Sequence, residues 1–126
     1  LSPNEKSLYA VDSESEYVWA FDVMPDHSLA NRRQFGHLRG IEHTDRGMIN
    51  HVDGMTIDND GRVYATSAAG VEVFAPSGEN LGVIPTPINP QNLAFAGKDG
   101  RTLYMVGHGN LFKVATLASK VVGRAK

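Results

Sequence analysis

A strand pattern that repeats along the chain constrains its fold more than any other feature. Three times, a polar turn leads into a short strand in which a tyrosine lies between two apolar residues, and these tyrosines are Tyr9, Tyr64 and Tyr104. A second apolar strand follows each one after a short loop, and glycines and prolines punctuate the whole chain. Tyr64 and Tyr104 are 40 residues apart, a period typical of the four-stranded blade of a β-propeller. We therefore predict an all-β fold, with a β-sandwich of about seven or more strands as the alternative.

The repeat divides the chain into blade-like units within a single partial propeller domain, residues 1–126. The expected units are 1–35, 53–86 and 90–122, about two and a half to three four-stranded blades. The first unit lacks its first strand, the second is complete, and the third has three strands with 119–122 as a candidate fourth. Propellers usually close with four or more blades, and open edge strands invite pairing. We expect the chain to be part of a larger propeller, or several copies to assemble into one.

A long connection, residues 36–52, separates the first two units. It is polar and rich in glycine, and it holds three of the five histidines, namely His37, His43 and His51. Long connections in compact domains are often functional, because binding residues are commonly carried on loops. We expect this segment on the face around the central channel of the propeller; the alternative is a solvated surface loop.

Composition excludes several classes of function. Lys and Arg number 12 against 14 Asp and Glu, for a net charge of −2, so the chain has no electrostatic footprint for nucleic acid. The sequence has no basic amphipathic run and no apolar stretch near the ~18 residues of a membrane span. The absence of cysteine removes disulfides, thiolate metal sites and cysteine nucleophiles. The motifs of phosphate-binding loops and of serine hydrolases are also missing.

Residues 53–64, Asp-Gly-Met-Thr-Ile-Asp followed by Asn-Asp-Gly-Arg-Val-Tyr, resemble a signature of the gluconolactonase / senescence marker protein (regucalcin) family. Residues 1–9, 95–98 and 111–114 resemble further pieces of the family pattern in the same order. The resemblance implies a six-bladed β-propeller, of which this chain matches the C-terminal part. It also implies a fold and metal site similar to those of diisopropyl fluorophosphatase.

The resemblance further implies a divalent cation in the central channel, most often calcium, with magnesium, manganese or zinc as alternatives. Asp53 is the position that matches a metal ligand, and the family's other ligands would lie N-terminal to Leu1. Such an ion polarises a lactone carbonyl and lowers the pKa of a bound water. The resemblance also suggests Asp53 as the catalytic general base. The alternative for Asp53 is a turn-forming Asp-Gly pair without a ligand.

His51 and His108 are candidate substrate-binding residues near the channel mouth; the alternative is that both are merely exposed.

The function we expect is metal-dependent hydrolysis of sugar lactones, with this chain carrying the C-terminal part of the site. The isolated chain should therefore be poorly active. The alternatives are a non-catalytic propeller fragment or interaction module that lacks a complete metal site, and hydrolysis of phosphotriesters or aryl esters. The expected partners are a small lactone and either a second copy or an N-terminal half that completes the ring. Relatives of this kind occur in the cytoplasm and the periplasm, so the compartment stays open.

Overall fold

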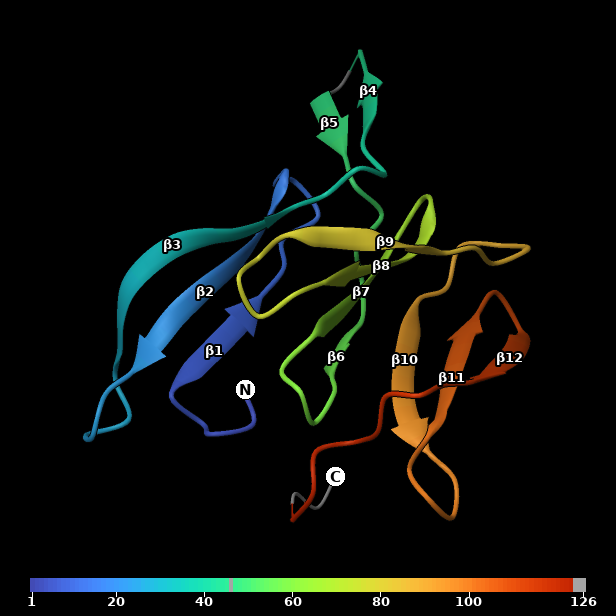
Figure 1. Ribbon diagram of the computed structural model, residues 1–126. Helices are drawn as coiled ribbons and strands as arrows, with labels where there is room; N and C mark the ends of the chain where they lie inside the picture. The colour runs from blue at the N-terminus through green and yellow to red at the C-terminus, as the bar shows by residue number, and fades with distance from the viewer. Residues whose placement is uncertain (46, 124–126) are drawn as a thin grey trace.

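The computed structural model describes residues 1–45 and 47–123, and over this range the chain is built from strands, turns and loops without a helix (Figure 1). It therefore offers no helix that could cross a membrane within the described residues. In chain order the described strands are β1 (Ser7–Ala10), β2 (Tyr17–Val23), β3 (Leu29–His37), β4 (Glu42–Thr44), β5 (Gly47–Ile49), β6 (Met55–Ile57), β7 (Val63–Ser67), β8 (Gly70–Phe74), β9 (Asn80–Ile84), β10 (Asn92–Ala96), β11 (Thr102–Gly107) and β12 (Asn110–Ala115).

The strands form three antiparallel sheets and a separate hairpin. The first sheet has the order β1-β2-β3, the second β6-β7-β8-β9 and the third β10-β11-β12, while β4 and β5 pair with each other. All three sheets are meanders whose neighbouring strands are consecutive in sequence. The structure thus agrees with the prediction of an all-β chain, and its three sheets contain three, four and three strands. The hairpin lies inside the long connection, where the sequence indicated no strands.

The candidate fourth strand of the third unit, 119–122, is not found. Lys120 forms only an isolated bridge with Asp58, and the Asn59 N–H donates to the Ser119 carbonyl at 2.8 Å. The Lys120 N–H donates to the Gly100 carbonyl at 2.9 Å. These bonds carry the segment past the start of β11 towards the second sheet instead of along β12, so the prediction of a fourth strand is wrong.

Two apolar clusters hold the sheets together, one on each face of the second sheet. On β7, Val63 and Ala65 face the first sheet and Tyr64 faces the third, as strand alternation requires. The cluster between the first and second sheets contains Val18, Leu38, Val52, Val63, Ala65 and Phe74. The cluster between the second and third sheets contains Tyr64, Val71, Leu93, Phe95, Leu103 and Met105.

The close approach of the first two sheets depends on a glycine. A Cβ atom at Gly36 would lie 2.5 Å from a ring carbon of Phe74, nearer than packed atoms can approach. The ring of Phe74 is fully buried. Any side chain at position 36 would therefore push β3 away from the second sheet.

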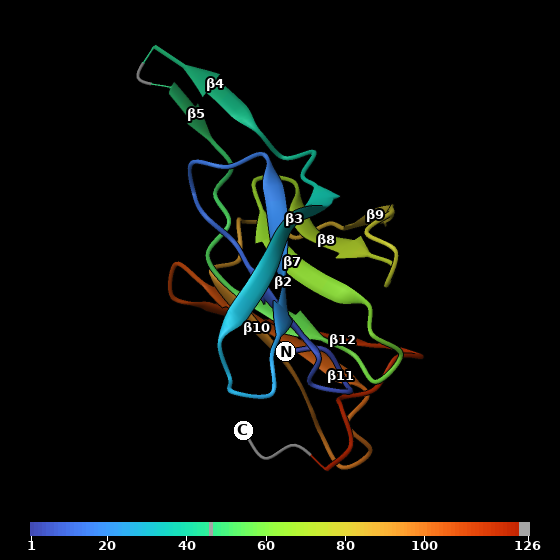
Figure 2. The ribbon, with the colours of Figure 1, turned by 90° about the vertical axis from the view of Figure 1, so that its left-hand side faces the viewer.

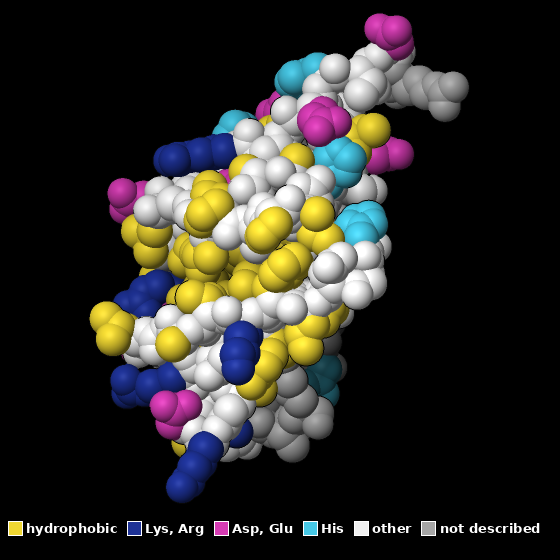
Figure 3. Space-filling view, turned by 90° about the vertical axis from the view of Figure 1, so that its right-hand side faces the viewer, with side chains coloured by type: hydrophobic (Ala, Val, Ile, Leu, Met, Phe, Trp, Pro, Cys, Tyr) yellow, Lys and Arg dark blue, Asp and Glu magenta, His cyan; other side chains and the backbone are white. Residues whose placement is uncertain are grey.

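The outer faces of the first and third sheets are open. On the third sheet, Val106 is 43% and Leu111 66% exposed, and they lie on the face that points away from the second sheet. Figure 3 shows apolar side chains gathered over this side of the molecule. On the first sheet the Arg32 guanidinium stacks on the Trp19 ring at 3.9 Å. Figure 2 shows this sheet in front, with the β4–β5 hairpin projecting beyond it.

Candidate functional site

Asp53 directly precedes β6 and combines a fixed main chain with a free side chain. The N–H groups of Asp53 and Gly54 both donate to Thr66 Oγ1, at 3.0 and 3.1 Å. Thr66 is fully buried on β7, and its own N–H donates to the Gly54 carbonyl at 3.0 Å. The Asp53 side chain is exposed, and no hydrogen bond or ion pair occupies its carboxylate among the residues that the structure describes. A carboxylate on a rigid main chain is well suited to bind a ligand.

The start of β10 lies beside the start of β6. A Cβ atom at Gly54 would be 2.6 Å from both the Cα and the Oδ1 of Asn92, so only glycine permits this approach. Asn92 therefore lies next to the Asp53–Gly54 peptide. Its Oδ1 accepts the Leu93 N–H at 2.8 Å, and its amide NH₂ has no hydrogen-bond partner among the described residues. Asn92 is not among the residues predicted from the sequence, where its only signal is the polar pair Gln91-Asn92 ahead of an apolar strand.

His108 lies in the turn between β11 and β12, where its φ is 49°. Its N–H donates to Gln91 Oε1 at 3.1 Å, and Asn110 Nδ2 donates to its carbonyl at 2.9 Å. Gln91 thus ties this turn to the residue before Asn92. His108 is exposed and belongs to the same end of the third sheet as the start of β10.

His51 adopts a left-handed conformation with φ of 55°, which is uncommon for a residue other than glycine and often marks functional segments. Its Nε2 lies 3.2 Å from Glu42 Oε2, and its side chain is 37% exposed. The imidazole therefore closes the base of the β4–β5 hairpin, where it pairs with a hairpin carboxylate rather than with Asp53. His43, on β4, is exposed.

The donor set at Asp53 suits a hard cation but is incomplete. Carboxylate and amide oxygens are the ligands that calcium and magnesium prefer, and calcium takes 6–8 of them. Asp53 supplies a carboxylate, and Asn92 is the neighbouring amide side chain. Within the described range, no three His, Asp or Glu side chains gather in a way that could hold a metal ion. The described residues thus fit part of a calcium shell.

The second aspartate of the same segment, Asp58, is fully buried. Its Oδ1 accepts the N–H groups of Asp60 and Arg62, at 3.0 and 2.8 Å. Its Oδ2 accepts from Arg62 Nη1 at 2.8 Å and from the Tyr64 hydroxyl at 3.0 Å. Burial, reinforced by the charge of Asp58, raises the pKa of Tyr64 above its usual value. Asp58 thus organises the turn between β6 and β7 and has no capacity left for a ligand.

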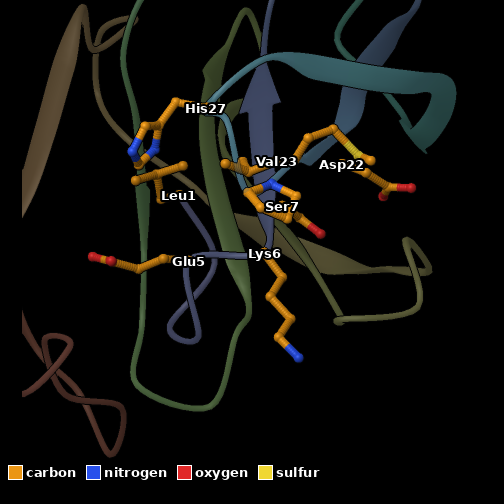
Figure 4. A pocket seen from close by; sticks show the side chains of 9 residues that line it. Leu1, Glu5, Lys6, Ser7, Asp22, Val23 and His27 are labelled. Carbon is orange, nitrogen blue, oxygen red and sulfur yellow. The ribbon is translucent and has the colours of Figure 1, made fainter.

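Two of the hollows on the described surface lie away from Asp53. One of about 620 Å³ is lined by the start of β1 and the turn after β2, including Lys6, Asp22 and His27. Figure 4 shows His27 next to Leu1, with the Lys6 side chain pointing away from them. No residue of the hairpin or of β6 lines this hollow, so it is separate from Asp53. The other, of about 550 Å³, lies between β5 and the 13–14 turn, and its lining includes Glu14 and Met48.

Known proteins resemble this chain over most of its length. The family model described as the SMP-30/Gluconolactonase/LRE-like region matches residues 1–109. A gluconolactonase of Zymomonas mobilis subsp. mobilis is 33% identical over 119 residues, which are 92% of this chain and 33% of the relative. A lactonohydrolase of Aspergillus oryzae is 33% identical over 104 residues, 82% of this chain and 20% of the relative.

Solved structures give the same picture. A gluconolactonase from Xanthomonas campestris superposes with a TM-score of 0.75 at 30% identity, covering 90% of this chain and 35% of that protein. A calcium-binding regucalcin from Agrobacterium tumefaciens superposes with a TM-score of 0.75 at 17% identity, covering 94% and 45%, a likeness of fold alone. The chain thus spans a third or less of the curated relatives named above and under half of these two solved structures.

Proposed function

Because the chain belongs to the SMP-30/gluconolactonase/LRE-like family, we propose that it forms the C-terminal part of a metal-dependent hydrolase of sugar lactones. The observation that carries the proposal is Asp53. By the resemblance of residues 53–64 to the family motif it matches a metal-ligand position. Its main chain is held by buried Thr66, and its carboxylate is free within the described part of the chain. The relatives named as gluconolactonase and lactonohydrolase support the substrate class.

In this proposal the Asp53 carboxylate holds a divalent cation, calcium foremost. The ion, when bound, would polarise the lactone carbonyl and lower the pKa of an attacking water. Thr66 fixes Asp53 through its main chain. The Asn92 amide donates to a substrate oxygen beside Asp53, and His51 and His108 contact the hydroxyl groups of the substrate from the surrounding turns. Asp53 is also the candidate general base for the water.

We further propose that the three sheets are blades of a six-bladed propeller. The open face of the third sheet, with Val106 and Leu111 exposed, would then be covered by another blade, and β1 would pair with an inner strand. Those blades come either from an N-terminal half or from further copies of the chain. The TM-scores of 0.75 against longer family structures support the assignment of the three sheets to the fold of those structures.

The incomplete donor set favours a second candidate function. Since no cluster of three His, Asp or Glu side chains is found among the described residues, the chain by itself would be a non-catalytic interaction module. The two functions differ in whether a metal is retained and whether a lactone is opened.

The test is native mass spectrometry with calcium, magnesium, manganese or zinc, followed by glucono-lactone hydrolysis, on the wild-type chain and on Asp53→Asn. Asp99→Asn, in an exposed turn, is the matched control. We expect an assembled species that retains a metal and opens the lactone, both lost in Asp53→Asn only, with little activity from a monomer. An assembled species that retains no metal and opens no lactone would contradict the proposal and support the interaction module.

A further inference from the structure

A buried carboxylate holds the connection that leads into the hairpin. Glu72, on β8, has no exposed surface. The Arg39 N–H donates to both of its oxygens at 3.0 Å, the Gly40 N–H donates to Oε1 at 2.9 Å, and Asn80 Nδ2 donates to Oε2 at 2.6 Å. Two of the three donor groups are therefore main-chain amides of the connection just before β4.

Glu72 depends on these amides because no cation pairs with it in the described part of the chain. A buried carboxylate is costly unless hydrogen bonds replace its hydration. If residues 39–40 moved away, the charge would keep only the Asn80 amide. The contact is also tight, because a Cβ atom at Gly40 would lie 2.8 Å from Ser67 Oγ and 2.9 Å from the Ala69 nitrogen. The docked position of the connection is therefore strongly favoured over any detached one.

A second buried side chain holds the connection where it leaves the hairpin. Asn50 has no exposed surface, and its Nδ2 donates to the carbonyls of Asp12 and Ser15, at 2.6 and 2.5 Å. Its Oδ1 accepts the Val52 N–H at 2.8 Å. Glu72 thus ties the entry to the second sheet, and Asn50 ties the exit to the first. Figure 1 shows the hairpin rising above the junction between these two sheets.

The exit anchor lies close to the candidate metal ligand. Three residues span at most about 11 Å, so the α-carbons of Asn50 and Asp53 cannot be farther apart than that. Val52, between them, is buried in the apolar cluster, and Thr66 holds the Asp53 main chain. The hairpin base and Asp53 therefore belong to one rigidly supported stretch of chain.

We propose that Glu72 and Asn50 are positioning residues that fix the β4–β5 hairpin as a rigid rim at the Asp53 site, rather than as a mobile lid. The inference rests on the proposed lactone hydrolase function. In this arrangement the substrate passes a rim of fixed shape, and the rim sets how tightly a hydroxylated lactone is held. The reaction step itself depends on Asp53, whose main chain is anchored independently by Thr66. Loosening the rim should therefore weaken substrate binding more than it slows catalysis.

The first test is hydrogen exchange on the full chain. Glu72→Gln removes the charge and one of the two acceptor oxygens, so the four bonds from Arg39, Gly40 and Asn80 can no longer all form. Asn50→Ala removes the other anchor. In either variant we expect the amides of 42–45 and 47–49 to exchange about tenfold faster or more, with β10–β12 unchanged. Glu79→Gln, at an exposed position just before β9, and Asn80→Ala, which leaves the connection's bonds to Glu72 intact, should leave the hairpin unchanged. Hairpin exchange that stays at the wild-type rate, or rises equally in all three sheets, would overturn the proposal.

The second test is steady-state kinetics on the metal-loaded, assembled protein with glucono-lactone. We expect Glu72→Gln to raise KM about five- to tenfold with kcat within about twofold of wild type, whereas a fall in kcat at constant KM would overturn the proposal. Should Glu72→Gln fail to fold, Asn50→Ala tests the same rim from the other sheet. A wild-type protein without lactone hydrolysis would refute the proposed function, and the exchange pattern would still decide whether the rim is fixed.

Discussion

Asp53 and Asp58 are separated by only four residues, yet they have opposite environments. Asp58 is fully buried. It accepts hydrogen bonds from the main-chain N–H groups of Asp60 and Arg62, from the Arg62 guanidinium and from the Tyr64 hydroxyl. Asp53 is exposed, and within the described residues only its main chain is held. A carboxylate whose lone pairs are all used is part of the scaffold, and one with a fixed main chain and free oxygens is available to a ligand. The same Asp-Gly-rich segment thus supplies a structural acid, Asp58, and the acid that we propose as a metal ligand, Asp53.

The largest loss of stability is expected when Asp58 is replaced. Asp58→Ala leaves the Arg62 guanidinium, the Tyr64 hydroxyl and two amides without their shared acceptor, and we expect the free energy of unfolding to fall by about 3 kcal/mol. Urea denaturation would measure it. Asp60→Ala is the matched control, because Asp60 pairs with the same Arg62 at 3.0 Å but its side chain is 65% exposed; its cost should be below about 1 kcal/mol. Equal costs for the two variants would mean that Asp58 is not the organising residue.

Thr66 is the next largest contribution, since it holds Asp53 in place. Thr66→Val removes the acceptor of the Asp53 and Gly54 N–H groups, and we expect a loss of about 2 kcal/mol of unfolding free energy. Metal retention at Asp53 should weaken with it. Thr66→Ser keeps the hydroxyl and should lose less than half as much, so equal losses would point to packing of the methyl group. Urea denaturation and a metal titration read the two effects separately.

A smaller effect concerns the proton on Tyr64. Burial and the charge of Asp58 raise the pKa of this phenol, whereas in the unfolded chain it titrates near ~10. The unfolded state therefore releases the proton first as pH rises, so the stability due to Tyr64 is present below about pH 10 and is lost above it. We expect the urea midpoint of wild type to fall more steeply from pH 10 to 11 than that of Tyr64→Phe. Tyr104→Phe, which leaves the Asp58 bond intact, should follow wild type; identical slopes for all three would contradict this assignment.

Local patterns account for what the sequence predicts well. The turn-and-tyrosine repeat identifies the three sheets, and strand alternation puts Glu72 on the same face as Phe74. The burial of Glu72 could not be foreseen, because its amide partners Arg39 and Gly40 are more than 30 residues away in sequence. The β4–β5 hairpin was missed because its strands have three residues each, too few to show alternation.

The candidate site could be derived from the sequence only in part. Asp53 is predicted as a ligand because residues 53–64 resemble a family motif, and the structure leaves its side chain exposed. Asn92 was missed because its position beside Gly54 arises from contact between two sheets, which no local pattern encodes. The environment of His51 also depends on a distant partner, since the hairpin brings Glu42 to its imidazole. Residues 119–122 looked like a strand by composition, but hydrogen bonds to Gly100 and Asn59 direct them elsewhere.

The smallest expected change in stability is that of Asp53→Asn without metal, and it separates the role of Asp53 from that of Asp58. Without metal, Asp53→Asn should change the free energy of unfolding by less than about 0.5 kcal/mol, because the side chain is exposed and its main-chain bonds to Thr66 remain. With calcium at 100 times its Kd, wild type should gain about 2.7 kcal/mol from binding to the folded state, and Asp53→Asn should gain none. Thermal or urea unfolding with and without calcium measures both quantities. A large loss without metal would make Asp53 a second scaffold residue like Asp58, whereas a loss confined to calcium would establish that the exposed acid serves the ligand and the buried one serves the fold.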